Sequence, residues 1–328
     1  MNVGGSTVLD VRGLKTRFRT GRGVVAAVNG VSFQIARGER LAVVGESGSG
    51  KSATALSLVQ LLGPGGRVTA GSVSLNGRDL LRMSDGEWLA VRGKEVAMVF
   101  QDPATSLNPV LRVGDQLVPP MLRHLAIDTA TARGRAIDLL RQVGIPDPDA
   151  RIDAYPHELS GGMRQRVLIA MAVSCGPDLI IADEPTTALD VTIQAQIVAL
   201  LKNLSEQTGT AVLFITHDFG LVARFAHTVA VMYAGRFVEF GPARQLFSDP
   251  RHPYTQALLR SIPTIAGPKP DRLTQIEGAP PDMAALGPGC PFAPRCPLAF
   301  DRCLVERPEL VETSPGHSAA CWACKVDP

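Results

Sequence analysis

A glycine-rich stretch at residues 45–52 has the residue types needed to hold the phosphates of a nucleotide. Its sequence, GESGSGKS, matches the pattern G-x-x-x-x-G-K-S and stands between a short apolar run and a helix-forming run, as this pattern requires. We expect Lys51 to reach the β- and γ-phosphates and Ser52 to bind Mg²⁺. Glycines let backbone N–H groups face phosphate oxygens, and the following helix adds its positive N-terminal end. The alternative is a glycine-rich turn without a ligand. The expected backbone cradle consists of Gly45, Ser47, Gly48, Ser49 and Gly50.

Two adjacent carboxylates follow the apolar run at residues 179–182. At the tip of a strand, Asp183 can hold Mg²⁺ through water, and Glu184 can orient or deprotonate an attacking water molecule. Acidic residues in such a place are often only the solvated start of a loop. Because the same chain carries the phosphate-loop pattern, we predict that both residues are functional, with Glu184 catalytic.

The stretch LSGGMRQ at residues 159–165 carries a family resemblance. Ser160, Gly161 and Gly162 are expected to begin a helix, whose N-terminus would be a second anion site. The stretch resembles the signature sequence of ABC-type ATPases. The chain also resembles this family in the order of its motifs: phosphate loop, Gln101, signature, Asp183-Glu184, the ALD string at residues 188–190, and His217.

The resemblance implies an enzyme that hydrolyses ATP with Mg²⁺. In that family the signature of one subunit closes on the nucleotide of its partner, so a head-to-tail dimer is implied. By the same resemblance His217 contacts the γ-phosphate and fixes the water together with Glu184. Gln101 would ligate Mg²⁺, sense the γ-phosphate, and lie on a loop that faces membrane subunits. Phe18 is the candidate for stacking on adenine, although a core phenylalanine fits its position equally well.

The elements that must position these residues are those of an α/β fold. Apolar runs without alternation at residues 41–44, 96–100, 179–182 and 211–215 predict strands of a parallel sheet covered on both faces. Apolar residues at spacings of three and four within 191–204 predict a helix that stops at Gly209. Residues 8–39 are expected to form antiparallel strands, and residues 111–173, which show no strand signal, a mostly helical insertion. The resembled family has the same parts: a RecA-like parallel sheet core, an antiparallel β subdomain and an α-helical subdomain.

Proline content marks a boundary in the chain. Fifteen of the 25 prolines lie within residues 241–328, so the last part of the chain is expected to be rich in loops. We therefore expect an ABC ATPase domain at residues 1–245, with its helical subdomain at about 104–175. A C-terminal extension that binds metal is expected at residues 246–328.

Longer stretches resemble the ATP-binding subunits of bacterial oligopeptide and dipeptide permeases. They lie at residues 100–109, 155–159, 182–192 and 252–259. The resemblance implies a subunit that powers peptide import, working with two transmembrane permease subunits and an extracytoplasmic solute-binding protein. Two different ATPase subunits are common in this subfamily, which favours a heterodimer over a homodimer. Importers of nickel and other small solutes share these motifs and are the alternative.

The charge and hydropathy of the chain limit its possible partners and its possible location. With 33 basic and 31 acidic residues the formal charge is +2, so no strong field favours nucleic acid as a partner. No apolar run reaches the ~20 residues that a spanning helix needs, and residues 1–10 lack the pattern of a signal peptide. The expected location is therefore peripheral, at the cytoplasmic face of the cell membrane. Less favoured are a soluble ABC ATPase that acts on DNA or ribosomes and a metal or redox sensor that only binds ATP.

Five of the six cysteines lie within residues 290–324. Without a secretion signal a disulfide framework is not expected, which leaves a metal or redox site. Structural zinc usually has C-x₂₋₄-C pairs, and only Cys321 and Cys324 have that spacing. Peptide-permease subunits that this chain resembles hold a [4Fe–4S] cluster here, which implies a cluster in this chain as well, with zinc or reduced thiols as alternatives. The implied ligands are Cys290, Cys296, Cys303 and Cys321.

Overall fold

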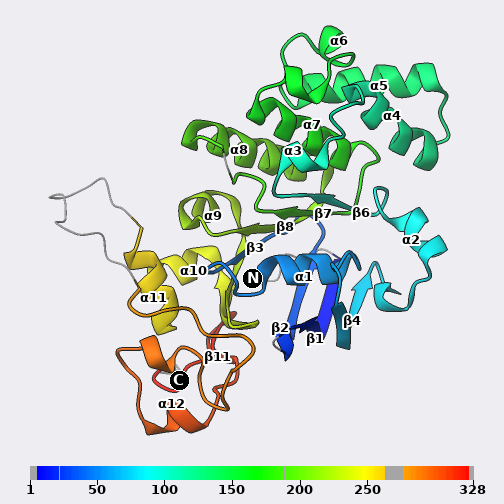
Figure 1. Cartoon of the computed structure of the whole chain (residues 1–328). Helices are drawn as coiled ribbons and strands as arrows, with labels where there is room; N and C mark the ends of the chain where they lie inside the picture. The colour runs from blue at the N-terminus through cyan, green and yellow to red at the C-terminus, as the bar shows by residue number, and fades with distance from the viewer. Residues whose placement is uncertain (1–5, 22, 188, 263–275, 325–328) are drawn as a thin grey trace, which may run out of the picture.

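A computed structural model describes residues 6–21, 23–187, 189–262 and 276–324. Its centre is an eight-stranded sheet in the order β11-β12-β10-β9-β3-β8-β7-β6, with helices on both faces (Figure 1). Five neighbouring strands run parallel, and the apolar runs of the sequence predicted all of them except β9. These strands are β3 (Arg40–Val44), β6 (Val96–Val99), β7 (Leu179–Asp183), β8 (Ala211–Thr216) and β9 (Thr228–Tyr233).

Apolar and polar residues do not alternate along these strands, because the strands are buried on both faces. Ala42 and Val44 of β3 pack into one hydrophobic cluster, whereas Leu41 and Val43 pack into another. The first cluster includes side chains of α7 (Gly161–Val173), α8 (Val191–Thr208) and α9 (Phe219–Phe225), and the second includes α1 (Lys51–Leu58). Since neither face meets water, the inner positions of such a strand select apolar residues.

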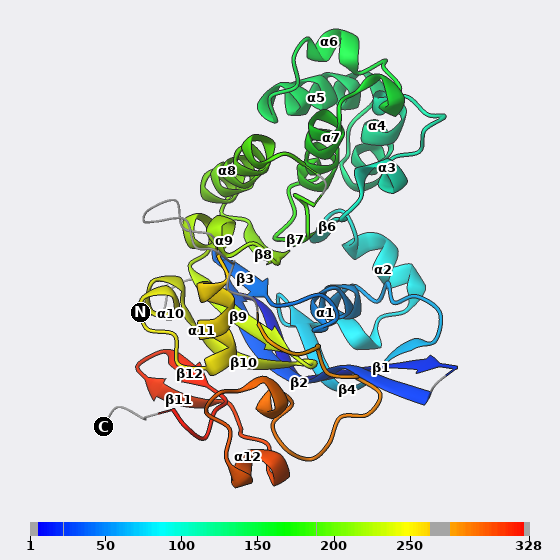
Figure 2. The same ribbon diagram turned by 60° about the vertical axis from the view of Figure 1, so that its left-hand side comes forward.

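A second sheet packs beside the first across α1 (Figure 2). It is antiparallel, in the order β2-β1-β4-β5, and its first two strands confirm the prediction for residues 8–39. Its third strand was not predicted from the sequence. The strands are β1 (Thr7–Thr20), β2 (Gly23–Ala36), β4 (Gly66–Leu75) and β5 (Arg78–Asp79).

A helical part lies beyond the β6 end of the main sheet, at the top of Figure 1. It confirms the predicted helical insertion, and it is followed by the long helix α8, which ends at Gly209 with φ 68° as expected. The helices of this part are α3 (Pro103–Ser106), α4 (Val113–His124), α5 (Thr129–Gln142), α6 (Pro148–Arg151), the 3₁₀ turn η2 (Pro156–Glu158) and α7. The 3₁₀ turn η1 (Leu80–Arg82) and α2 (Asp85–Val91) connect β5 to β6. Ala188 of the ALD string lies outside the described residues.

The C-terminal part is loop-rich, as its prolines indicated, yet it also enlarges the main sheet. Strand β12 (His317–Ala319) pairs antiparallel with β10 (Arg236–Pro242), and β11 (Val311–Ser314) pairs with β12. The sequence did not predict these strands. The other elements here are α10 (Ala243–Ser248), α11 (Pro253–Arg260), the 3₁₀ turn η3 (Ala293–Arg295) and α12 (Asp301–Val305).

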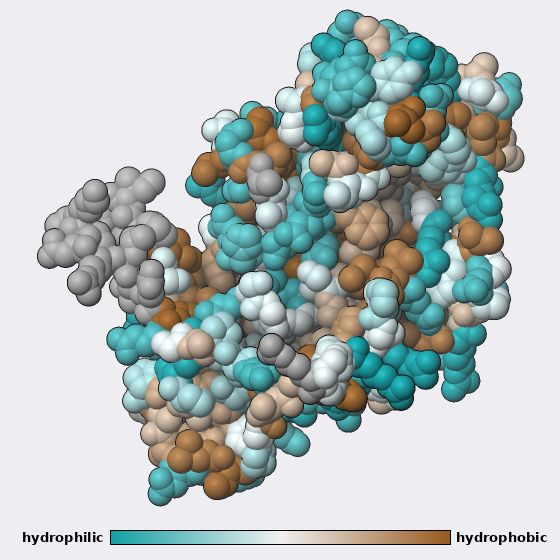
Figure 3. Space-filling view, viewed as in Figure 1, coloured by the Kyte–Doolittle hydropathy of each residue, from teal (hydrophilic) through white to brown (hydrophobic). Residues whose placement is uncertain are grey.

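Two structural features concern contact with a membrane or with another protein. Within the described ranges, no helix is both long enough and apolar enough to cross a bilayer. Exposed apolar side chains gather around α12, at the lower left of Figure 3. They include Leu298, Phe300, Leu304 and Val305.

Candidate active site

The phosphate loop connects β3 to α1, as its sequence context predicted. A Cβ atom at Gly45 would lie 2.2 Å from the Met232 carbonyl oxygen, and one at Gly50 would lie 2.2 Å from the Ala27 carbonyl oxygen. Gly50 also has φ 109°, a conformation that side chains disfavour. Because the backbone passes this close to β9 and β2, only glycine fits at these two positions.

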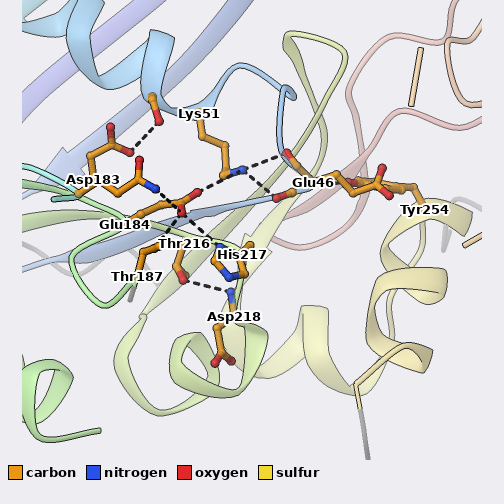
Figure 4. Close-up of polar contacts among 12 residues, drawn as sticks. Glu46, Lys51, Asp183, Glu184, Thr187, Thr216, His217, Asp218 and Tyr254 are labelled. Atoms are coloured by element: carbon orange, nitrogen blue, oxygen red, sulfur yellow. Dashed lines mark hydrogen bonds and ion pairs between the residues drawn. The ribbon is translucent and has the colours of Figure 1, made fainter. Parts of the chain in front are cut away.

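Lys51 turns back over the loop. Its Nζ donates to the carbonyl oxygens of Gly45 (2.8 Å) and Glu46 (3.0 Å), and it lies 3.9 Å from Oε1 of Glu184 (Figure 4). Burial lowers the pKa of Lys51, while the carboxylates of Glu184, Asp183 and Glu46 oppose that shift. A bound phosphate would give this buried ammonium a further counter-charge.

Ser52 and Asp183 form an oxygen pair at the start of α1 and the end of β7. The Ser52 hydroxyl donates to Oδ1 of Asp183 at 3.0 Å. Burial raises the pKa of Asp183, and the hydrogen bond from Ser52 opposes the shift. A hydroxyl beside a buried carboxylate is the kind of oxygen donor set that Mg²⁺ takes, so the two residues fit the predicted metal.

Glu184 is the centre of the site. Its Oε2 accepts from Thr187 Oγ1 at 3.0 Å and from Gln101 Nε2 at 3.5 Å, and it lies 3.3 Å from His217 Nδ1 (Figure 4). Glu184 also adopts φ 46°, and its N–H donates to the Ile215 carbonyl of β8. Thus the ends of the parallel strands β6, β7 and β8 bring together the side chains that the sequence had singled out separately.

Thr187 was not predicted from the sequence as a site residue. It lies in the stretch 182–192 that was quoted for the family resemblance, but a threonine has no distinctive signal without a structure. Its hydroxyl gives Glu184 a fixed donor, which restricts the rotation of the carboxylate. We therefore regard it as a positioning residue.

The signature lies apart from this cluster. Ser160 caps α7, because its hydroxyl accepts from the Met163 N–H at 3.3 Å, and Gly162 lies against Ile193 of α8. This confirms the predicted helix start. Among the described residues, no recorded hydrogen bond or ion pair links residues 160–162 to the phosphate loop.

Phe18 lies in β1, paired with Val25 of β2 and Gly66 of β4. Its ring occupies the space beside Gly66, where a Cβ atom would come within 2.6 Å of it. The ring is half-buried. Stacking on adenine stays a prediction for this residue.

Four cysteines of the C-terminal part line one small cavity together with His252 and Phe292: Cys290, Cys296, Cys303 and Cys321. Burial raises the pKa of Cys290 and Cys296. A hydrogen bond from Cys324 lowers the pKa of Cys321. Within the part of the chain that the structure describes, no three His, Cys, Asp or Glu side chains are grouped closely enough to hold a metal ion. The predicted metal-binding character of the extension is therefore not shown.

Comparison with known proteins identifies the family. An ABC transporter model matches residues 28–187, and a model of the C-terminal region of oligopeptide/dipeptide transporters matches residues 238–303. The chain is 49% identical over 316 residues to the dipeptide transport ATP-binding protein DppD of Bacillus subtilis (strain 168), covering 96% of this chain and 94% of that protein. The chain belongs to the ABC transporter family.

Other relatives agree with this assignment. The dipeptide transport ATP-binding protein DppD of Escherichia coli (strain K12) is 50% identical over 314 residues, which is 96% of each chain. Among solved structures, the dimeric ATP-binding cassette MJ0796, in a post-hydrolysis state with ADP and Pi, has a TM-score of 0.65 at 28% identity. It covers 72% of this chain and 99% of its own. The chain therefore has the ABC ATPase fold and is an ATP- and Mg²⁺-dependent ATPase subunit of an ABC transporter.

Proposed function

We propose that this ABC ATPase drives the import of di- or oligopeptides through a membrane permease. The observation that carries the ATPase part is the convergence of Gln101, Thr187 and His217 on the Glu184 carboxylate, beside the phosphate loop. The peptide part rests on relatives named as dipeptide or oligopeptide transport proteins and on the matching C-terminal region. Importers of nickel or another small solute are the second candidate, by the likeness of the motifs alone.

The chemistry follows from the positions of these groups. The backbone N–H groups of the phosphate loop, apart from that of Glu46, would bind the phosphates. Lys51 would turn to the β- and γ-phosphates, and Ser52 and Asp183 would hold Mg²⁺. When bound, Mg²⁺ neutralises charge on the transferring phosphoryl group. Glu184 would accept a proton from the attacking water as general base.

Three further residues complete the proposed chemistry. Thr187 keeps the Glu184 carboxylate in place, and His217 is close enough to Glu184 to share in holding the water. Gln101, which reaches the same carboxylate, would sense the γ-phosphate as a Mg²⁺ ligand. Phe18 is the proposed adenine-stacking residue.

A second ATPase subunit would supply the missing anion site. Ser160, Gly161 and Gly162 at the start of α7 are exposed or half-buried residues, and the N–H groups of such a helix start can bind phosphate on a neighbouring molecule. The structural relative MJ0796 is dimeric. We propose a heterodimer rather than a homodimer, by analogy with the subfamily.

The permease would bind near Gln101. Phe100, Val110 and Leu111 are large apolar side chains that stay exposed on either side of α3, with Val110 75% exposed. Such side chains suit contact with another protein. We place the subunit peripherally, at the cytoplasmic face of the membrane, with two transmembrane subunits and, in the full system, a solute-binding protein. The proposed domain division is 1–245 and 246–328.

Two variants test the ATPase mechanism in the assembled transporter. Glu184→Gln should lower turnover at least ~100-fold, because removal of a general base costs 10²–10⁴-fold, while ATP stays bound. Lys51→Ala should instead weaken ATP binding. Glu309→Gln, an exposed glutamate of the extension, is the matched control and should keep full turnover. Full turnover in Glu184→Gln would refute the assignment of the base.

We further propose that the extension binds a [4Fe–4S] cluster through Cys290, Cys296, Cys303 and Cys321. Support comes from their placement around one mostly apolar cavity. A cubane gives each thiolate its own iron, so its ligands lie farther apart than the four ligands of one tetrahedral zinc. Among the described residues no compact group for a single ion is found, and this weighs against zinc more than against the cluster.

Anaerobic purification tests this assignment. We expect absorbance near 400 nm, with iron and sulfide in equal amounts. Cys303→Ser should lose the absorbance, whereas Cys175→Ser, which changes a cysteine outside the extension, should keep it. Colourless protein with stoichiometric zinc, or protein with no metal, would overturn the cluster.

A further inference from the structure

The C-terminal extension contacts the phosphate loop directly. Arg295 donates from both terminal nitrogens to the carboxylate of Glu46, the second residue of the loop, at 2.7 and 2.9 Å. The Arg295 side chain is only 4% exposed and that of Glu46 is 24% exposed. A bidentate pair that is this well shielded from water is among the stronger and more directional contacts in proteins.

Arg295 is itself held in place. Its Nε donates to the Glu277 carbonyl at 3.0 Å, and one terminal nitrogen also lies 3.3 Å from the Tyr233 hydroxyl. The residue ends η3, where its N–H donates to the Phe292 carbonyl. Because these hydrogen-bond partners hold the guanidinium in place, it faces Glu46 in a single orientation.

The backbone of Glu46 is also engaged from the extension. Its N–H donates to the hydroxyl of Tyr254, which belongs to α11 and is fully buried, at 2.8 Å (Figure 4). Nearby, Pro280, Pro281 and Met283 line a small cavity together with loop residues 46–49. The extension therefore touches both the side chain and the main chain of the same loop residue.

These contacts have an electrostatic consequence. Glu46 puts a negative charge on the loop that must accept a polyphosphate, and like charges at close range in a shielded site repel strongly. Arg295 neutralises that charge. The bond to Tyr254 satisfies an N–H group and fixes the backbone, so the loop does not need to be ordered when the nucleotide binds.

We propose that Arg295 and Tyr254 are positioning residues through which the C-terminal extension sets the affinity of the phosphate loop for nucleotide. The inference rests on the proposed function only in taking ATP as the ligand of this loop. It gives the extension a role in nucleotide binding, through residues that lie far from the phosphate loop in the sequence.

The test measures equilibrium binding of Mg·ATP to the purified chain. Arg295→Ala should raise the dissociation constant about tenfold, equivalent to ~1.4 kcal/mol, because Glu46 is left uncompensated. The double variant Arg295→Ala/Glu46→Gln should recover most of the affinity, since the repelling charge is gone. Arg302→Ala removes another Arg–Glu pair of the extension, the one with Glu306, and is the matched control that should bind as the wild type does.

A second measurement does not depend on nucleotide. In the free protein, amide hydrogen exchange in residues 45–50 should be faster in Arg295→Ala and in Tyr254→Phe than in Arg302→Ala, while the melting temperature reports any global loss of stability. Faster exchange restricted to this loop supports a positioning role.

The outcomes separate the two claims. Unchanged ATP affinity in Arg295→Ala, with affinity lost in Lys51→Ala, would overturn this inference and leave the proposed function intact. Failure of Glu46→Gln to restore affinity would overturn the electrostatic role of Arg295. Equal ATP binding by the wild type and Lys51→Ala would refute the proposed function instead, and the exchange data would then still decide whether the extension orders the loop.

Discussion

Glu239 offers a demanding test of how the extension is attached. This residue of β10 is fully buried, and its carboxylate accepts from the N–H groups of Arg251 (2.7 Å) and His252 (2.9 Å). It also lies 2.7 Å from Nε2 of His317, on the neighbouring strand β12, whose side chain is 1% exposed. One carboxylate therefore joins the main sheet to two segments of the extension.

The expected cost of removing it follows from this geometry. Glu239→Ala leaves buried donors from three residues without their acceptor, and breaking a buried pair by removing one partner costs about 3–5 kcal/mol of the free energy of unfolding. Glu239→Gln keeps one side-chain oxygen as an acceptor but replaces the other with an NH₂ group, which cannot accept from the remaining donors. It should cost about 1.5–3 kcal/mol of the free energy of unfolding, the range for a hydrogen bond to a charged group.

Urea unfolding followed by circular dichroism measures both costs, and thiol labelling reports whether the extension opens. In Glu239→Ala the cysteines around the cavity should react with a thiol reagent at lower urea concentrations than the main transition. Glu306→Gln is the control, because Glu306 is exposed and, among the residues that the structure describes, its side chain pairs only with the exposed Arg302. Its unfolding midpoint should not change.

The reasoning would be refuted if Glu239→Ala unfolded at the wild-type midpoint. It would also be refuted if Glu239→Gln were less stable than Glu239→Ala, since the ranking depends on how many buried donors keep an acceptor. A loss of stability without earlier thiol labelling would show that the extension and the sheet separate only on global unfolding.

Two further predictions concern the loop and the pH dependence of stability. Gly50→Ala should abolish Mg·ATP binding and lower the melting temperature, because the added Cβ would lie 2.2 Å from the Ala27 carbonyl oxygen, whereas Gly134→Ala, which meets no atom within 4 Å in helix α5, should bind ATP normally. Burial lowers the pKa of His252 from 6.5 to about 4, so the unfolded chain binds more protons than the folded one between these values. The free energy of unfolding should thus fall as pH drops from 7 to 4, by about 3 kcal/mol from this residue. In urea unfolding across that range, a His252→Gln chain should show a shallower dependence of the free energy of unfolding on pH. An unchanged pH dependence would contradict the assignment.

Most of the active site could be predicted from the sequence because its residues carry local patterns. The phosphate loop and the signature are each a contiguous stretch, and Glu184 directly follows a strand that is apolar up to its last residue, Asp183. Parallel strands align such strand ends at one edge of a sheet, so the convergence of Gln101, Glu184 and His217 followed from their common position after a strand.

The residues that the sequence missed act through long-range contacts. Arg295 and Tyr254 meet Glu46 across more than two hundred positions, and neither belongs to a pattern that indicates a partner. Strand β12 was missed for a similar reason. It has three residues, too few to show alternation, and it exists because β10 offers it an edge.

The pairing of β12 with β10 bears on how the protein is made. During synthesis β10 emerges long before Ala319, its partner for Glu239, has left the ribosome. Until then, β10 is an open edge strand of the main sheet, and it carries the Glu239 carboxylate that is buried in the complete fold. Open edge strands can pair with other chains. A chain released before β12 would keep this edge, so the last strands protect the newly made ATPase sheet from association with its neighbours.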